Sequence, residues 1–214
     1  MQTRLVASLL TLGLSAVSPI AAAGPLGAPA ELDGGIRLFD LETETTNPQR
    51  VWIYWPARQR DDVPLVLIAP TGTNPLAAAE LSLDDRPEHL AYAKAGFAVV
   101  AYGLDGASGF GVESARGALE LALGNFERID VERVFTAGRG SGGTVALVVA
   151  AHIPEIRAAV ALEPITHVEK SMTAEVESMD AATDGYRAAL RRHDPAHLVD
   201  RLDRPLFLHA SREA

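Results

Sequence analysis

A glycine-rich turn carries the residues of this sequence that could do chemistry. Gly138-Arg-Gly-Ser-Gly-Gly143 follows an apolar segment predicted to be a strand and precedes an apolar segment predicted to be a helix. A strand that turns directly into a helix leaves backbone N–H groups free at the helix N-terminus, where negative charge is stabilised. Two chemistries use this arrangement: a turn that carries the nucleophile of acyl transfer, and a loop that binds the phosphates of a dinucleotide.

The dinucleotide interpretation rests on the glycine spacing. Gly138 to Gly143 satisfies the G-x-G-x-x-G pattern, and Glu163 lies 20 residues beyond Gly143 at the predicted end of a strand, where an acidic residue would contact a ribose. The pattern sits on a mid-sheet strand instead of the first one, and a glycine pattern alone is weak evidence. This interpretation is therefore the least favoured of the alternatives.

The other reactive residue types do not suggest a metal or a cofactor. There is no cysteine, which excludes disulfides and thiolate chemistry. Of the six histidines, only His193 and His197 stand at metal-ligand spacing, and Pro195 between them disfavours a continuous helix. We expect no metal site and no cofactor.

Composition and charge point to an exported, acidic, single-domain protein. Residues 1–23 combine a basic start, an apolar run and the small residues Ala21-Ala22-Ala23, as in a signal peptide cleaved after Ala23. We expect a periplasmic or extracellular protein with one domain over residues 24–214 and no membrane attachment after cleavage. The formal net charge of -9 argues against nucleic acid as a partner, and the oligomeric state stays open.

The elements that must position the turn alternate between strand and helix. Residues 35–41 and 50–56 predict an antiparallel pair at a sheet edge. The continuous apolar run at 64–69 predicts a strand covered on both faces, and 97–102 predicts the next buried strand. Further strands are predicted at 134–137, 158–162 and 205–209, with helices at 84–95, 113–126 and 143–152 between the strands. This order implies an α/β fold with a mostly parallel central sheet and helices on both faces. Residues 163–200 look like a polar, lid-like insertion.

Three segments of the sequence carry a resemblance: Pro64-Leu-Val-Leu-Ile-Ala-Pro-Thr-Gly72, Ile129-Asp-Val-Glu-Arg-Val134 and the stretch from Asp194 to His209. They resemble segments of the α/β-hydrolase superfamily, in particular of its secreted esterases and prolyl-oligopeptidase-like members, and the resemblance covers roughly residues 50–214. It implies that Thr71 or Gly72 supplies one oxyanion N–H. It also implies a catalytic acid shortly after the last strand, which makes Glu213 a candidate, with Glu163 as a second one.

The resemblance fits the catalytic machinery less closely. The nucleophile of this superfamily needs small residues two positions to either side. Without a gap, Gly140 stands in the nucleophile position between Gly138 and Gly142, and Ser141 falls where the backbone N–H serves the oxyanion hole. If Ser141 is the nucleophile, the large side chain of Arg139 occupies a position that requires a small one.

The catalytic histidine is expected one strand later, and no such strand or histidine follows within the 214 residues. We expect a C-terminally incomplete α/β-hydrolase fold of the serine esterase or peptidase type, impaired or inactive as the sequence stands. If it is active, it hydrolyses a small ester or peptide. The alternative is a homologue that binds a ligand or partner without catalysis.

Overall fold

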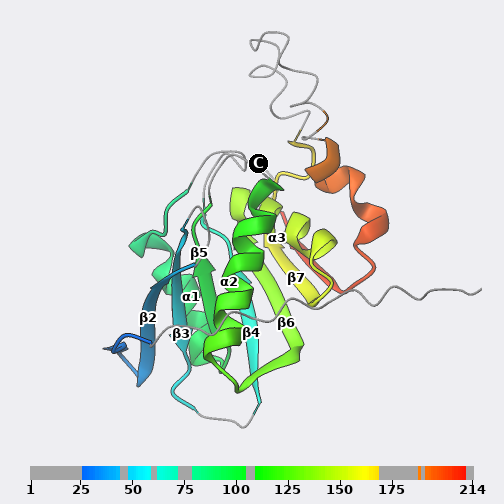
Figure 1. Ribbon diagram of the computed structural model, residues 1–214. Helices are drawn as coiled ribbons and strands as arrows, with labels where there is room; N and C mark the ends of the chain where they lie inside the picture. Colours follow the sequence, from blue (N-terminus) through cyan, green and yellow to red (C-terminus); the bar gives the residue numbers. More distant parts are fainter. Residues whose placement is uncertain are drawn as a thin grey trace, which may run out of the picture.

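An eight-stranded sheet forms the centre of the molecule (Figure 1). The computed structural model describes residues 26–43, 48–58, 62–71, 79–104, 109–168, 188 and 191–210. Within these residues the strand order is β1-β2-β3-β5-β4-β6-β7-β8. The strands are β1 (Ala30–Leu32), β2 (Ile36–Glu42), β3 (Arg50–Trp55), β4 (Val63–Ile68), β5 (Ala98–Tyr102), β6 (Ile129–Arg139), β7 (Ile156–Leu162) and β8 (Leu206–His209).

The sheet is antiparallel at its N-terminal end and parallel elsewhere. β1, β2, β3 and β5 pair in antiparallel fashion, whereas β5, β4, β6, β7 and β8 are all parallel neighbours. Parallel strands that are linked by helices end at the same edge of a sheet, and ligands bind at that edge. The segments after β4, β6 and β7 therefore meet at one place.

Helices cover both faces of the sheet, as the sequence predicts. Apolar side chains of α2 (Val112–Asn125) and α3 (Ser141–His152) pack with residues of the sheet on one face, and α1 (Arg86–Lys94) packs on the other. Short 3-10 turns lie at Leu83–Asp85, Gly109–Gly111, Pro195–His197 and Val199–Arg201. The prediction of an α/β fold with a mostly parallel sheet is confirmed.

Several element bounds differ from the sequence prediction. β1 adds an edge strand outside β2, β6 begins at Ile129 instead of Val134, and α3 begins at Ser141 instead of Gly143. The α3 start was missed because Ser141, Gly142 and Gly143 are weak helix formers, and close packing of the turn compensates for their low propensity.

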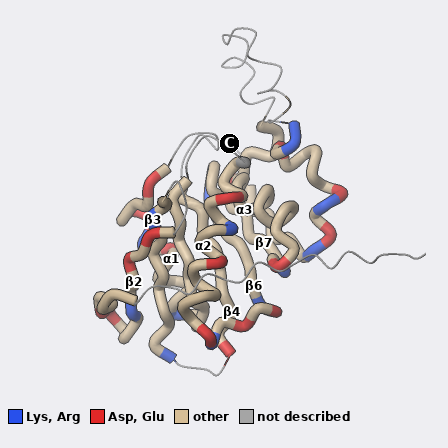
Figure 2. The backbone as a smooth tube through the Cα atoms, viewed as in Figure 1, with Lys and Arg blue, Asp and Glu red and all other residues tan. Residues whose placement is uncertain are grey.

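Positions of Lys and Arg and positions of Asp and Glu are both spread along the described backbone (Figure 2). Among the described residues, ion pairs join Asp40 to Arg50 and Glu132 to Arg157, each across two neighbouring strands or their ends. No helix in the described part of the chain is long and apolar enough to span a membrane. Residues 1–23, which we predict to be a signal peptide, lie outside the described residues.

Candidate functional site

The turn between β6 and α3 has Gly140 at its sharpest point. Gly140 adopts φ 57° and ψ -125°, a left-handed conformation that residues with a side chain seldom adopt. Its N–H donates to the carbonyl of Leu162 at the end of β7, with a donor to acceptor distance of 2.8 Å. The helix begins at the next residue, Ser141. Gly138 to Gly142 are called the elbow below.

Backbone contacts explain the glycines on either side of Gly140. A Cβ atom on Gly138 would lie 2.3 Å from the carbonyl oxygen of Gly142. A Cβ atom on Gly142 would lie 2.6 Å from the carbonyl oxygen of Pro70, in the segment that follows β4. Both positions therefore exclude side chains. Gly138 and Gly142 stand two positions before and two positions after Gly140. Small residues at these two positions are the pattern found around the nucleophile of α/β-hydrolases.

Ser141 and Arg139 occupy different environments on either side of Gly140. Ser141 is 3% exposed and is the first residue of α3. The side chain of Arg139 is 59% exposed, so the residue directly before Gly140 need not be small. Because Ser141 lies at the helix start, its N–H has no acceptor within the helix. The catalytic assignment of Ser141 stays a prediction.

Glu163 lies beside the elbow and binds Arg139. Both Nε and Nη2 of Arg139 donate to Oε2 of Glu163, each over 3.2 Å. Glu163 has a φ of 53° although it is not glycine, and its N–H donates to the carbonyl of His209 over 2.6 Å. Sequence reasoning named Glu163 and missed its partner. The signal was present, because Arg139 is the last residue of β6 and Glu163 directly follows its parallel neighbour β7.

The side chain of Thr144 in α3 forms hydrogen bonds with the segment that follows β7. Its hydroxyl donates to the carbonyl of Ile165 over 3.0 Å and accepts the N–H of Ile165 over 2.8 Å. Thr144 is fully buried. A single side chain thus satisfies both backbone groups of a residue two positions after Glu163. Sequence reasoning did not identify this residue.

The predicted oxyanion donor Thr71 already has an acceptor. Its N–H donates to Oδ2 of Asp85 over 3.3 Å. Glu88, one turn further along, has a buried Oε1 with no hydrogen-bond partner. Burial raises the pKa of Glu88, the negative charge of Asp85 raises it further, and the positive charge of Arg139 opposes both. The carboxyl groups of Asp85, directly before α1, and of Glu88, in its first turn, therefore lie near Thr71 and Arg139, respectively.

Two predicted site residues, Gly72 and Glu213, lie outside the described residues. Of the histidines, His89 is 1% exposed, and its Nδ1 lies 3.3 Å from the hydroxyl of Tyr54. Burial lowers the pKa of His89 to about 4. His167 and His209 are exposed. In the described ranges, no group of three or more His, Asp or Glu side chains is placed to hold a metal ion.

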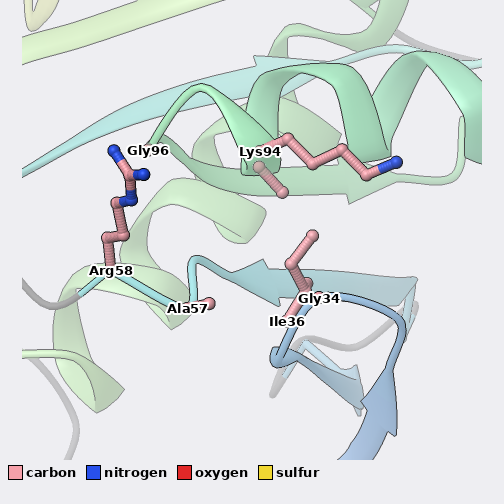
Figure 3. Close-up of a pocket in the computed structure, with 7 residues that line it drawn as sticks. Gly34, Ile36, Ala57, Arg58, Lys94 and Gly96 are labelled. Atoms are coloured by element: carbon pink, nitrogen blue, oxygen red, sulfur yellow. The ribbon is translucent and has the colours of Figure 1, made fainter.

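A small pocket of about 130 Å³ lies at the opposite edge of the sheet from the elbow (Figure 3). It lies between the C-terminal end of α1 and the chain around β2 and β3, with Ile36, Ala57 and Ala93 in its lining. Arg58 and Lys94 also line it, and Figure 3 shows their side chains extending in different directions. Because Lys94 lies in the last turn of α1, its charge is explained by the negative end of the helix dipole.

Comparison with known proteins agrees with this geometry. Residues 115–198, which contain the elbow, match the family model of acetyl xylan esterase (AXE1). No curated protein sequence matches the chain. Among solved structures, a puromycin-hydrolyzing peptidase of Mycobacterium tuberculosis is 17% identical with a TM-score of 0.60, over 81% of this chain and 30% of that one.

Two further structures show the same similarity. The acylaminoacyl peptidase of Pyrococcus horikoshii is 14% identical with a TM-score of 0.63, over 81% of this chain and 31% of that one. Acetyl xylan esterase 1 of Thermoanaerobacterium sp. is 16% identical with a TM-score of 0.53, over 86% of this chain and 71% of that one. The chain thus spans less than a third of the length of the two peptidases. The fold of this chain is thus the α/β-hydrolase fold, and the glycine spacing of its elbow is similar to that around the nucleophile of these proteins.

Proposed function

We propose that this protein is a homologue of the serine esterases and peptidases that binds an ester-like or peptide-like ligand at the elbow without acyl transfer. One observation carries the proposal. Gly140 occupies the strained point of the turn, flanked at two residues on each side by glycines that cannot be replaced without a backbone clash. A nucleophile of this superfamily stands at that point, and glycine has no side chain with which to attack.

The burial of Ser141 supports the same conclusion. A nucleophile must reach the carbonyl carbon of its substrate, whereas Ser141 is 3% exposed within the first turn of α3. Its N–H and those that follow in the first helical turn lack helical acceptors, so they are suited to polarise a bound carbonyl oxygen. The elbow would then bind the ligand, although Gly140 provides no side chain that could attack it.

The predicted acid Glu163 and the nearby carboxylate of Asp85 both have hydrogen-bond partners in the described geometry, whereas the other predicted acid, Glu213, lies outside the described residues. Glu163 binds the guanidinium of Arg139, and Asp85 holds the N–H of Thr71. We propose that the carboxylates of Glu163 and Asp85 lie beside the bound ligand and select its charge and orientation. Ester or peptide compounds are the proposed ligand class because the family model and the similar structures are those of esterases and peptidases.

The test is covalent labelling with a fluorophosphonate, which reacts with activated serine nucleophiles. The purified protein is incubated beside its Ser141→Ala variant, and an active serine esterase serves as the positive control. We expect no labelling of either form above that of heat-denatured protein. Labelling of the unmodified protein that Ser141→Ala abolishes would overturn the proposal and identify Ser141 as a nucleophile.

We also propose that the protein is exported after cleavage behind Ala23. The support is the composition of residues 1–23. Expression of the full chain in a bacterium, followed by N-terminal sequencing of the periplasmic fraction, should give a protein that begins at Gly24. Recovery of uncleaved chain from the cytoplasm alone would contradict this.

A further inference from the structure

β8 lies at one edge of the described sheet and exposes apolar side chains on both faces. Leu206, Phe207 and Leu208 are between 37% and 59% exposed. Leu206 is paired with Ala159, which belongs to the core on the α3 face, whereas Phe207 is paired with Val160, which packs on the α1 face. Neighbouring side chains of β8 therefore point to opposite faces of the sheet, and both faces of this strand are open to solvent.

The backbone of β8 is hydrogen-bonded to β7 through every second residue. The carbonyl groups of Pro205 and His209 accept N–H groups from β7 and from the residue directly after it, over 3.1 and 2.6 Å. Because backbone groups alternate in direction along a strand, Phe207 belongs to the same series. The N–H and carbonyl groups of Leu206 and Leu208 therefore point away from β7, toward the open edge of the described sheet.

The two edges of the described sheet differ in how well they are protected against pairing with a further strand. Proteins commonly protect such edges with short strands, charged side chains or proline. β1, at the opposite edge, has three residues and carries Glu31. Leu206 and Leu208 provide no such protection at the edge of β8. Pro205 does not block it either, because this residue belongs to the series that faces β7.

The open edge of β8 is complementary to itself. In an antiparallel pair of strands, residue pairs that exchange two hydrogen bonds alternate with pairs that exchange none. When two copies of β8 align around Phe207, Leu206 of each copy lies opposite Leu208 of the other. These are the two residues whose backbone groups point outward, so all of those groups become hydrogen-bonded. The two copies of Phe207 then lie directly opposite each other, at the closer spacing of a pair without hydrogen bonds.

The side chains agree with this alignment. On either side of the central residues, His209 lies opposite Pro205 and Ala210 lies opposite Arg204. No like charges therefore meet, whereas an aromatic pair forms at the centre, and both features favour the pairing of strands. A strongly charged partner would find no opposite charge on Leu206, Phe207 or Leu208. A second copy of the same apolar strand fits this edge better.

We infer that β8 is an interaction surface at which two copies of this chain associate, by antiparallel pairing of their β8 strands around Phe207. The two sheets then form one continuous sheet. The association is reversible, because the edge of one short strand covers less area than the roughly 1,200–2,000 Å² of a stable complex. In dilute solution the single chain predominates and its β8 is exposed. This inference does not depend on what the elbow binds.

Sedimentation velocity of the purified protein tests for the association. The protein is measured from about 1 µM to about 1 mM, the range in which weak complexes form. About 0.15 M salt screens the repulsion between the two acidic chains beyond about 8 Å. We expect the average mass to rise from that of one chain toward twice that value and no further, since pairing covers the β8 edge of both copies. A constant mass of one chain, or growth beyond two chains, would overturn the inference.

A charged variant locates the contact. Phe207→Glu replaces the central aromatic pair by two like charges directly opposite each other, so the dissociation constant should rise at least about tenfold. The matched control is Val131→Glu, which changes another exposed apolar residue of a strand and should associate like the unmodified protein. Far-ultraviolet circular dichroism checks that both variants are folded. Equal dissociation constants for the two variants would show that β8 is not the contact.

Cysteine variants test the alignment of the strands, since the chain has no cysteine of its own. In the inferred alignment, Cβ atoms at position 207 of the two copies lie about 4.5–5.5 Å apart, so Phe207→Cys should form a disulfide-linked dimer under mild oxidation. His209→Cys is the control on the same strand. Its two copies lie about 13 Å apart along the strands, at about 3.3 Å per residue, so it should cross-link at least about tenfold more slowly. Equal rates at both positions would contradict the inferred pairing.

Discussion

β6 and β8 belong to the same sheet and end at the same edge, but their surroundings differ completely. β6 lies between β4 and β7, and its last residues lead into a turn in which added Cβ atoms would meet backbone oxygens at 2.3 and 2.6 Å. β8 lies at the end of the described sheet, with Leu206, Phe207 and Leu208 exposed by 37%, 59% and 54%. Both segments are apolar in sequence. We therefore expect the position of a strand in the sheet, more than its hydrophobicity, to decide how much a substitution lowers the free energy of unfolding.

We expect the largest difference in the free energy of unfolding when a leucine in each of the two regions is replaced by alanine. Leu67 in β4 is fully buried beside β6, and Leu67→Ala should lower the free energy of unfolding by about 2–5 kcal/mol, because it removes buried methyl groups and leaves a cavity. The matched change Leu208→Ala on β8 should cost less than about 0.5 kcal/mol. Urea denaturation of both variants measures this. Equal losses would mean that β8 is covered in solution.

The next largest difference should appear in how the free energy of unfolding depends on pH, because a buried and an exposed histidine bind protons differently. Burial lowers the pKa of His89 to about 4, whereas a histidine in the unfolded chain titrates near its ordinary value of 6.5. As the pH falls from about 6.5 to 4, the unfolded chain binds a proton that the folded protein does not, so the free energy of unfolding should fall by about 3 kcal/mol through this group.

Two histidine variants separate the loss of stability that comes from His89 from the loss that comes from titration of carboxyl groups. His89→Gln should be less sensitive to acid than the unmodified protein over this interval, while His209→Gln on β8 should follow the unmodified protein. Denaturation midpoints at several pH values provide the measurement. Parallel curves for His89→Gln and the unmodified protein would show that the histidine is not held neutral.

Glycine gives a smaller contrast, since only one methyl group is added. Gly138→Ala places a Cβ against the carbonyl of Gly142, and backbone displacement should cost about 1–3 kcal/mol. Gly27→Ala, where nothing lies within 4 Å, should be neutral within about 0.5 kcal/mol. Thermal unfolding followed by circular dichroism compares the two. If Gly138→Ala is tolerated as well as Gly27→Ala, the elbow is looser than these contacts require.

The smallest effect should come from the ion pair beside the elbow. The side chains of Arg139 and Glu163 are 59% and 37% exposed, so Glu163→Gln should change the free energy of unfolding by less than about 1 kcal/mol. The exposed pair of Arg157 and Glu132, away from the elbow, serves as the control through Glu132→Gln. A much larger loss for Glu163→Gln would assign the pair a structural role instead of one in recognition.

The sequence predicted β4 and β5 well because their runs of Val, Ile, Leu and Ala are buried, as in Ala98–Tyr102. It also placed Gly140 at the strained point, since the spacing of Gly138 and Gly142 reflects local backbone contacts. β1 was missed because Ala30, Glu31 and Leu32 follow a Gly/Pro/Ala-rich lead and have little alternation. Such a short edge strand is specified by its neighbour β2.

The site partners were harder to predict than the turn itself. The contact of Thr71 with Asp85 and the hydrogen bonds of Thr144 with Ile165 join residues that are distant in sequence and carry no pattern. His152, His193 and Arg201 likewise meet only because the chain returns to α3 after β7. Tertiary packing creates these pairs, and local propensity does not encode them.

The double hydrogen bond of Thr144 has a mechanical consequence for the elbow. The hydroxyl of Thr144 is hydrogen-bonded to both the N–H and the carbonyl of Ile165. A displacement of the backbone after β7 along α3 would therefore break two hydrogen bonds at once. Gly140 is tied to the same strand end through Leu162. We therefore expect a ligand that binds Arg139 to displace the side chain of Glu163 and to leave in place the backbone after β6 and β7, which these hydrogen bonds connect.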